Sequence, residues 1–314
     1  MSTAVRAWMR FWFAPSRPDD LGFARLLFFA GLLAMYGLLD FSGWGRVSRA
    51  FWMPMPLFGV LHLSPAGPVA LEVMRQIWLL SLAASAVGFH TRPSMVVSFL
   101  LGTYLLGLPH NFGHTFHFDA TLVIAMGILA CSRAGDAWSL DAALAGKKKA
   151  GVVPGGEYTW PIRAIWVAMA LVFFAAGLAK LRHGGLEWIT SDNLAIVLNR
   201  AAYHVSDADP VGGAGLAIAR HGWLSRAVAI TTVVVELGFV VALFSRSARL
   251  FFVPAAFAML IGIRVLMGPT FGGFLILNVF WVPWSAALDA VTARAREKTR
   301  ASAAAATSDI SSML

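Results

Sequence analysis

Long apolar segments separated by short polar connections run along most of this chain. A bilayer core of about 30 Å needs roughly 20 apolar residues per helix, although several segments are shorter and would have to tilt or insert only partly. The pattern predicts an all-α polytopic integral membrane bundle of about eight transmembrane helices. The predicted spans are 21–39, 69–89, 94–109, 117–132, 161–181, 226–244, 249–267 and 272–288.

Three regions of the chain follow from this pattern. Residues 1–20 form an N-terminal segment in which Arg6 and Arg10 alternate with Trp8, Phe11 and Trp12, which is typical of a short helix lying at the headgroups. Residues 21–290 form the transmembrane domain, and residues 291–314, which become rich in Ala and Ser after Lys298, are expected to be a disordered cytoplasmic tail.

The connections between the spans add further expectations. Residues 41–66, rich in Trp, Pro and Gly, and residues 182–225 are predicted interfacial or re-entrant segments, the second with a short helix around Asn193–Tyr203. A weak similarity between the turns that begin at Gly88 and at Leu243 suggests two parallel four-helix halves.

The composition agrees with a protein surrounded by lipid. Hydrophobic residues make up 58% of the chain and charged residues 13%, whereas soluble domains carry about 25% charged residues. The net charge of +9 comes from arginines scattered singly beside apolar segments, so we expect no nucleic-acid partner. With both termini in the cytoplasm, most arginines and lysines fall on the cytoplasmic side, and we expect a multi-pass protein of the bacterial inner membrane.

Ionisable residues inside predicted spans are expensive and are therefore candidates for function. They are Arg25, Glu72, Arg75, Asp119, Lys180, Glu236 and Arg264. We expect Arg25 to be a snorkelling anchor, Glu72 and Arg75 to pair on one helix face, and Glu236 and Arg264 either to form an interhelical ion pair or to belong to a site. Lys180 ends an apolar run, where desolvation would favour a neutral amine that can act as a base.

The segment from His110 to Asp119 is the densest polar stretch. His110, His114 and His117 have the spacing of one helical face, which would suit metal ligands. Pro109 and Gly113 argue against a continuous helix, and no second histidine cluster exists, so we expect no metal and assign these histidines to a pocket or to interfacial packing. Cys131 is the sole cysteine, which excludes an internal disulfide or a thiolate zinc site.

Three stretches together resemble one family. They are His117-Phe-Asp119, Trp138-Ser-Leu-Asp141, and Phe173-Phe-Ala-Ala-Gly-Leu-Ala-Lys180-Leu followed by Trp188. In this order they resemble the horizontally transferred transmembrane (HTTM) domain family, which includes the membrane part of vitamin K-dependent gamma-carboxylase. The likeness covers roughly residues 20–285, and its most specific piece is the stretch around Lys180.

The resemblance implies a quinol-dependent oxygenase or epoxidase at the outer membrane interface. Lys180 matches the base that acts on a vitamin K-like hydroquinone, and His117 matches the assisting histidine. His110, His114, Asp119, Glu236, Arg264 and Trp188 are then expected to line the substrate pocket. The expected cofactor is a reduced quinone, and the expected partners are the lipid bilayer and a lipophilic quinone.

The chain differs from the eukaryotic carboxylase because no large soluble part follows Ala287. Protein glutamate carboxylation is therefore not expected. The alternative function is a non-enzymatic membrane maturation or export factor that binds a partner protein or secreted peptide. A transporter is disfavoured, because the polar groups gather in one half of the membrane.

Overall fold

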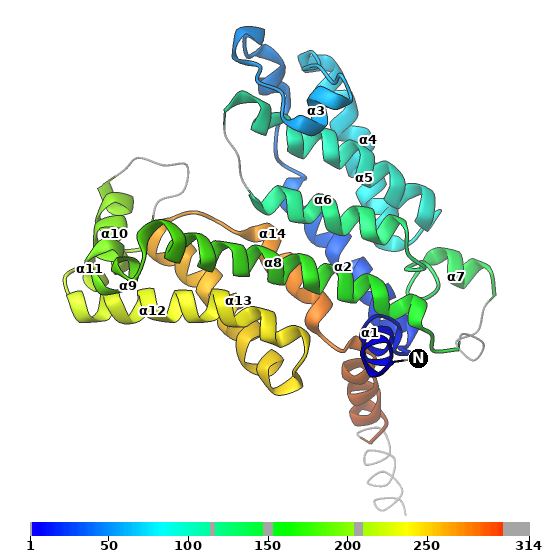
Figure 1. The fold of residues 1–314 in the computed structure, drawn as a ribbon. Helices are drawn as coiled ribbons and strands as arrows, with labels where there is room; N and C mark the ends of the chain where they lie inside the picture. The colour runs from blue at the N-terminus through cyan, green and yellow to red at the C-terminus, as the bar shows by residue number, and fades with distance from the viewer. Residues whose placement is uncertain (1, 114–116, 147–152, 204–209, 298–314) are drawn as a thin grey trace, which may run out of the picture.

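The computed structural model describes residues 2–113, 117–146, 153–203 and 210–297, and the described chain is an all-α bundle (Figure 1). Five helical segments are long and apolar enough to cross a membrane. They are Pro68–Val87 (α4), Thr91–Phe112 (α5, Thr91–Gly107, extended by a 3₁₀ turn), Gly156–Gly184 (α8, Thr159–Gly184, with the turn before it), Gly222–Leu243 (α12, Gly222–Gly238, extended by a 3₁₀ turn) and Arg246–Met267 (α13). The chain is therefore a multi-pass membrane protein.

The prediction of about eight spans is wrong in number: five segments qualify, or six if one bent pair counts as a single span. That pair is Gly272–Trp281, which contains α14 (Gly272–Leu277), and the last helix Trp284–Glu297, with a bend of 69° between them. The break falls at Val282 and Pro283, and proline cannot continue the backbone hydrogen bonding of a helix.

The other two predicted spans fail for different physical reasons. Helix α2 (Pro18–Tyr36) contains Asp19, Asp20 and Arg25, which is too many charges for a lipid-facing span. Helix α6 (His117–Ala130) has 14 residues, about 21 Å of helix, which is shorter than a bilayer core of about 30 Å. Both helices contribute fully buried side chains, including Leu21, Phe28 and Leu122, so other helices rather than lipid surround much of their surface.

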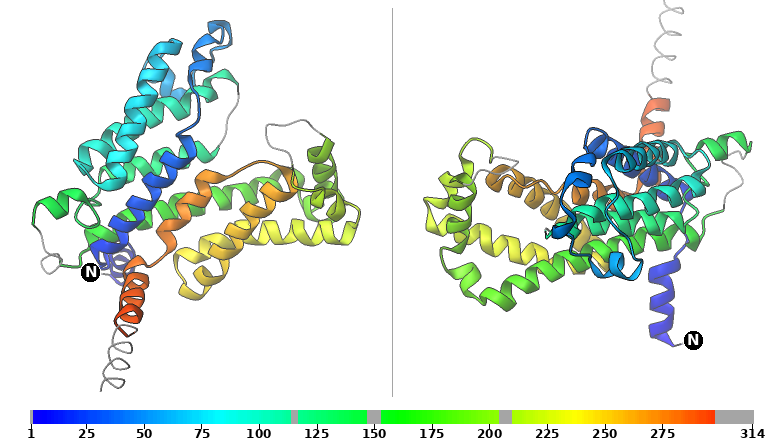
Figure 2. Two further views of the ribbon diagram at one scale, coloured as in Figure 1. Left: turned by 180° about the vertical axis from the view of Figure 1, so that it is seen from behind. Right: turned by 90° about the horizontal axis from the view of Figure 1, so that it is seen from above.

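The helices form two groups. The first contains α2, α4, α5 and α6, and the second contains α8, α12 and α13, with the short α10 (Asn193–Tyr203) and α11 (Ala214–Ala219) at one end. Helix α6 packs beside α8 and α14 packs against α2 and α6, which joins the groups (Figure 1, Figure 2). The proposed repeat behind two four-helix halves stays a prediction.

Several local predictions are confirmed. The N-terminal segment contains the helix α1 (Thr3–Phe13), and α10 spans the residues expected for the helix in the 182–225 connection. Arg75 Nη1 lies 3.0 Å from Glu72 Oε1 on one face of α4. The last helix reaches Glu297, into the segment predicted to be disordered; residues 298–314 lie outside the described part.

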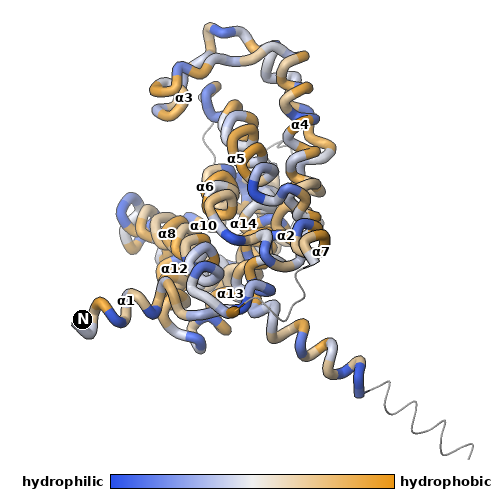
Figure 3. The backbone as a smooth tube through the Cα atoms, turned by 90° about the vertical axis from the view of Figure 1, so that its right-hand side faces the viewer, coloured by the Kyte–Doolittle hydropathy of each residue, from blue (hydrophilic) through white to orange (hydrophobic). Residues whose placement is uncertain are grey.

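The surface of the spans is apolar, as lipid contact requires. On α4, the exposed side chains Val69, Val73, Ile77 and Leu80 recur at helical spacing along one face. Figure 3, which colours the backbone by hydropathy, shows that hydrophobic residues make up much of the long helices.

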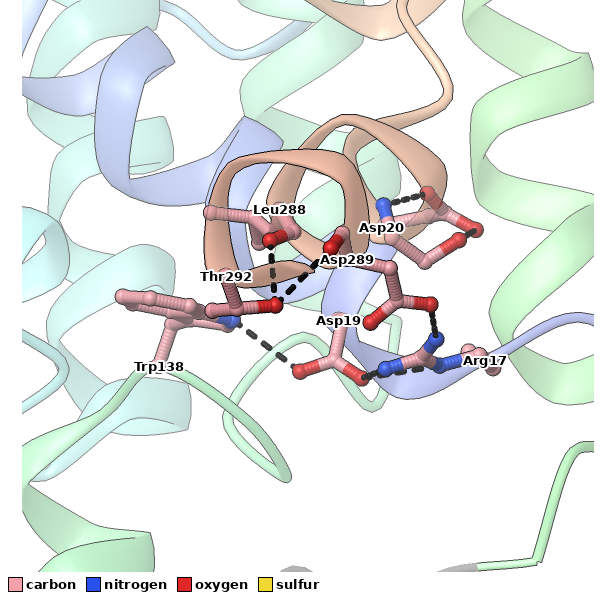
Figure 4. Close-up of polar contacts among 8 residues, drawn as sticks. Arg17, Asp19, Asp20, Trp138, Leu288, Asp289 and Thr292 are labelled. Carbon is pink, nitrogen blue, oxygen red and sulfur yellow. Dashed lines mark hydrogen bonds and ion pairs between the residues drawn. The ribbon is translucent and has the colours of Figure 1, made fainter. Parts of the chain in front are cut away.

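The prediction that Arg25 snorkels to the interface is wrong. Its side chain is fully buried, and its guanidinium donates to the backbone carbonyls of Gly22 and Trp138. Trp138 has an unusual positive φ of 54°, and its indole Nε1 donates to Asp19 over 3.1 Å (Figure 4). The Trp138 loop thus supplies an internal acceptor for the arginine in place of water.

The same end of α2 is tied to the last helix. Arg17 bridges Asp19 and Asp289, and Asp20 accepts hydrogen bonds from Ser285, so charged and polar contacts join the first and last helices of the bundle (Figure 4). A pocket of about 920 Å³ lies beside this network, lined by Arg17, Asp19 and the 136–143 segment among others, and it contains none of the predicted site residues.

Asp141, the last residue of the Trp138-Ser-Leu-Asp141 motif, caps the N-terminus of α5. Its carboxylate accepts hydrogen bonds from His90 N, Thr91 N and Thr91 Oγ1 at 2.9, 2.7 and 2.8 Å. Partial burial alone would raise the pKa of Asp141, but these hydrogen bonds prevail and hold its pKa below the ordinary value. This motif therefore has a structural role: Trp138 binds Arg25 and Asp141 caps α5.

We predict that replacing Gly88 by alanine destabilises the protein strongly. Gly88 has a φ of 72°, and a Cβ there would collide with the buried Arg25 guanidinium and lie 2.7 Å from Ser139 Cα. The left-handed backbone costs an alanine about 1 kcal/mol, and the overpacking should add about 1–3 kcal/mol. Gly146→Ala is the matched control, because Gly146 has a φ of 61° but no atom within 4 Å of an added Cβ. Thermal unfolding in detergent should show a clearly larger loss for Gly88→Ala, and equal losses would contradict this packing.

We also predict an acid-dependent loss of stability through Asp141. Because folding lowers its pKa, the carboxylate stabilises the fold above the ordinary aspartate pKa of about 4. That contribution disappears as the pH falls through the lowered value. The difference in Tm between wild type and Asp141→Asn should therefore be large near neutrality and shrink in acid, measured by thermal unfolding across pH. Asp192→Asn, which removes an exposed ion pair with Arg226, should have little effect throughout.

Candidate functional site

The predicted base, Lys180, lies near the end of α8 and is paired with Glu236 of α12. Its Nζ donates to both Glu236 carboxylate oxygens, at 2.6 and 2.8 Å. The Glu236 side chain is 7% exposed and that of Lys180 is 25% exposed, so the carboxylate is the inner member of the pair and the ammonium the outer one. In the apolar bundle the attraction between the two charges offsets part of the desolvation cost that each would otherwise carry alone.

The residues of the motif around Lys180 explain how the pair forms. Gly177 lies one turn before Lys180 on the same face of α8, and a Cβ there would approach Glu236 Cβ to 3.0 Å and Leu237 Cγ to 2.9 Å. Phe173, a further turn back, packs against Phe239 with ring centroids 4.6 Å apart. The absence of a side chain at Gly177 lets α8 and α12 approach closely where the ion pair lies.

Trp188 completes this group from the segment after α8. Helix α8 ends at Gly184, and Gly185, with a φ of 57°, turns the chain into the short helix α9 (Glu187–Thr190). Lys180 Nζ lies 5.4 Å from the centre of the Trp188 ring, within cation–π range. Glu236, which is distant in sequence, thus forms one cluster with Lys180 and Trp188.

Arg264 is not the partner of Glu236. Both oxygens of Glu236 bind Lys180, so the alternative in which Glu236 pairs with Arg264 is wrong. Arg264 lies near the end of α13, where Val265 O accepts a hydrogen bond from Val211 N just before α11. The sequence missed the correct partner because a single sequence gives the depth of a residue in its span but not the direction in which its helix face points.

A second polar group forms where α2 ends and α6 begins. Tyr36 OH donates to Asp119 Oδ1 over 3.0 Å, and His110 Nε2 lies 3.2 Å from Asp119 Oδ2. Tyr36 and His110 are buried. Sequence reasoning did not single out Tyr36; its one signal is a phenol at the end of an apolar segment, because a buried tyrosine hydroxyl usually needs a hydrogen-bond partner.

The histidine segment does not form one helix. A 3₁₀ turn, Leu108–Phe112, is followed by Gly113 with a φ of 92°, and α6 starts at His117, as Pro109 and Gly113 suggested. His114 and the side chain of His117 lie outside the described residues. Within the described part, no group of three His, Cys, Asp or Glu side chains is placed to hold a metal.

Both polar groups lie at the same end of the bundle. Helices α6 and α8 run side by side in opposite directions, so the start of α6 and the end of α8 lie at one end (Figure 1, Figure 2). The other end holds the start of α8, where Thr159 Oγ1 donates to Ser16 Oγ over 2.8 Å. The pocket beside Arg17 belongs to that other end, separated from Lys180 by most of the length of α8.

Comparison with known proteins gives one match. The model of the HTTM domain matches residues 13–268, while no curated protein and no solved structure matches the chain. The matched region contains α2 to α13, including Lys180, Glu236 and the Trp138 loop. The chain therefore belongs to the HTTM domain family, a membrane domain family found in vitamin K-dependent carboxylase-like proteins.

Proposed function

We propose that this HTTM protein is a quinol-dependent membrane enzyme, an oxygenase or epoxidase, in which Lys180 and Glu236 together handle the proton of a lipophilic hydroquinone. The observation that carries the proposal is the contact of Lys180 Nζ with both oxygens of a carboxylate that is almost completely buried. A buried ionisable group with a specific charge partner is a candidate for proton exchange at neutral pH.

The pairing changes how we assign the chemistry. The Glu236 carboxylate accepts both hydrogen bonds that Lys180 Nζ donates, so the two side chains compensate each other's charge. We therefore assign proton uptake to Glu236 and charge compensation to Lys180. When Glu236 accepts a proton from a hydroxyl that reaches the pair, the Lys180 ammonium remains to stabilise the negative charge left behind. This attraction is strong because little water screens it.

The surroundings of the pair are consistent with a hydroquinone. A hydroquinone supplies, when bound, a weakly acidic hydroxyl and two reducing electrons. Before Lys180, α8 exposes the apolar residues Leu178 and Ala179. After Lys180, the last turn of α8 exposes the polar residues Arg182 and His183. The pair is therefore near the boundary between apolar and polar surface, where a lipophilic molecule can place its polar head while its tail stays in lipid.

Other side chains at the Lys180 end are proposed to assist the pair. His117, at the start of α6, is the proposed assisting group, and Trp188 limits the outer side of Lys180. The Tyr36–Asp119–His110 group is a further set of hydrogen-bonding side chains at this end. We also infer that this end faces away from the cytoplasm and that both termini are cytoplasmic, from the distribution of arginines and lysines.

The proposal predicts that oxygen consumption with a reduced, short-tailed quinone depends on both members of the pair. Lys180→Met and Glu236→Gln should each reduce the rate at least 100-fold, roughly the contribution of a positioned proton-transfer group. The measurement is oxygen uptake by purified protein in lipid nanodiscs. Arg182→Ala is the matched control, because it removes an exposed charge of the same helix end, and it should keep the activity.

Loss of folding must be separated from loss of chemistry. Lys180→Met leaves the buried carboxylate without its partner and should cost about 3 kcal/mol. The double variant Lys180→Met/Glu236→Gln removes both charges, so its Tm should return toward that of the wild type while its activity stays absent. Wild-type rates in the folded double variant would exclude this mechanism, whereas no oxygen uptake by the wild type with any reduced quinone would favour the non-enzymatic maturation or export factor.

A further inference from the structure

Two arginines share one tryptophan ring at the end of the bundle opposite to Lys180. The guanidinium carbon of Arg163, in the second turn of α8, lies 4.3 Å from the centre of the Trp166 ring, and that of Arg249, in the first turn of α13, lies 4.2 Å from it. The Trp166 ring in turn stacks on Trp281 with centroids 4.3 Å apart. The aromatic pair therefore holds two positive charges from different helices close together.

No acidic side chain compensates these charges in the described part of the chain. The ion pairs found there use other basic residues, and the hydrogen bond that Arg249 makes, from Nε, goes to the backbone carbonyl of Ala242 at 3.2 Å. Arg246, exposed at the start of α13, adds another positive charge nearby. Partly buried cations of like charge repel one another, so an anion bound between them would remove an energetic cost.

The geometry leaves donors available for such an anion. A guanidinium that stacks by its face still presents N–H groups along its edge, in the planar arrangement that matches two oxygens of a phosphate. The indole Nε1 of Trp12 is also buried and has no hydrogen-bond partner in the described structure. Trp12 contacts Phe11, whose ring lies 5.2 Å from the Arg163 guanidinium carbon, so this third donor belongs to the same region.

The apolar surface around the arginines indicates that the anion is part of a lipid. Helix α1 exposes Trp8 and Phe13 beside Arg6 and Arg10, the composition of a helix that lies on a membrane surface. Next to Arg249, Leu250 and Phe251 of α13 are 73% and 62% exposed. A free anion needs no such surface, whereas acyl chains do.

We propose that Arg163 and Arg249 bind the phosphate of an anionic phospholipid, whose acyl chains lie along Leu250 and Phe251 and whose headgroup is covered by α1. The site joins α1, α8 and α13, so a bound lipid fixes the interfacial helix to the bundle. This site is independent of the chemistry proposed for Lys180.

The test compares the full chain in vesicles of phosphatidylcholine with and without phosphatidylglycerol. A lipid that binds the folded state raises Tm, so phosphatidylglycerol should stabilise the wild type. Arg163→Gln/Arg249→Gln should lose this shift and should retain at least tenfold less phosphatidylglycerol after purification, because a hydrogen bond to a charged group is worth about a factor of ten. Arg92→Gln, an exposed arginine at the start of α5 on the same end, is the matched control and should behave as wild type.

A lysine double variant and inorganic phosphate test two parts of this proposal, the guanidinium donors and the lipid. Arg163→Lys/Arg249→Lys keeps the charge but loses the planar donors and should retain only part of the shift, so full retention would overturn binding by the guanidinium edges. If inorganic phosphate stabilises the protein equally in phosphatidylcholine alone, the site binds a soluble anion and the lipid assignment is wrong. Equal shifts in Arg163→Gln/Arg249→Gln and Arg92→Gln would overturn the site altogether. The Tm in pure phosphatidylcholine shows for each variant that it is folded.

Discussion

A charge inside a bundle surrounded by lipid has to find its partner within the protein, and much of this structure follows from that requirement. Arg25 is fully buried and reaches the carbonyl of Trp138 in the loop after α6. Lys180 reaches Glu236 across α8 and α12, and Tyr36 and His110 reach Asp119 where α2 meets α6. In each case the partner comes from a different element of the chain, so the buried polar groups fix which helices lie next to one another.

Close backbone contacts make these pairings possible. At Gly177 the lack of a side chain brings α8 against Glu236, and at Gly88 it makes room for the Arg25 guanidinium beside Ser139. In both places the glycine lies against the charged residue, so a larger side chain in its position would push that residue and its helix away. The Ala-Gly-x-x-Lys stretch is therefore a packing motif as well as a chemical one.

Two sites at opposite ends of the bundle differ in the way they balance charge. At the Lys180 end, the carboxylates of Glu236 and Asp119 lie next to a cation or hydrogen-bond donors, an arrangement suited to exchanging protons. At the opposite end, Arg163 and Arg249 rest on aromatic rings without a carboxylate among the described residues, an arrangement suited to holding an external anion. The chemistry and the membrane attachment that we propose are thus separated by most of the length of α8.

The sequence by itself determined the class of the protein, its family and most helix positions, and it singled out Lys180 as a candidate, because hydropathy and local motifs depend on neighbours along the chain. It did not determine the number of spans, since short helices such as α6 and charged ones such as α2 are stabilised by burial among other helices rather than by their own composition. It also gave no partner for Lys180 and placed Arg25 at the interface. Only the tertiary structure decided these, because which face of one helix meets another depends on close contacts such as those at Gly177 and Gly88, between residues far apart in the chain.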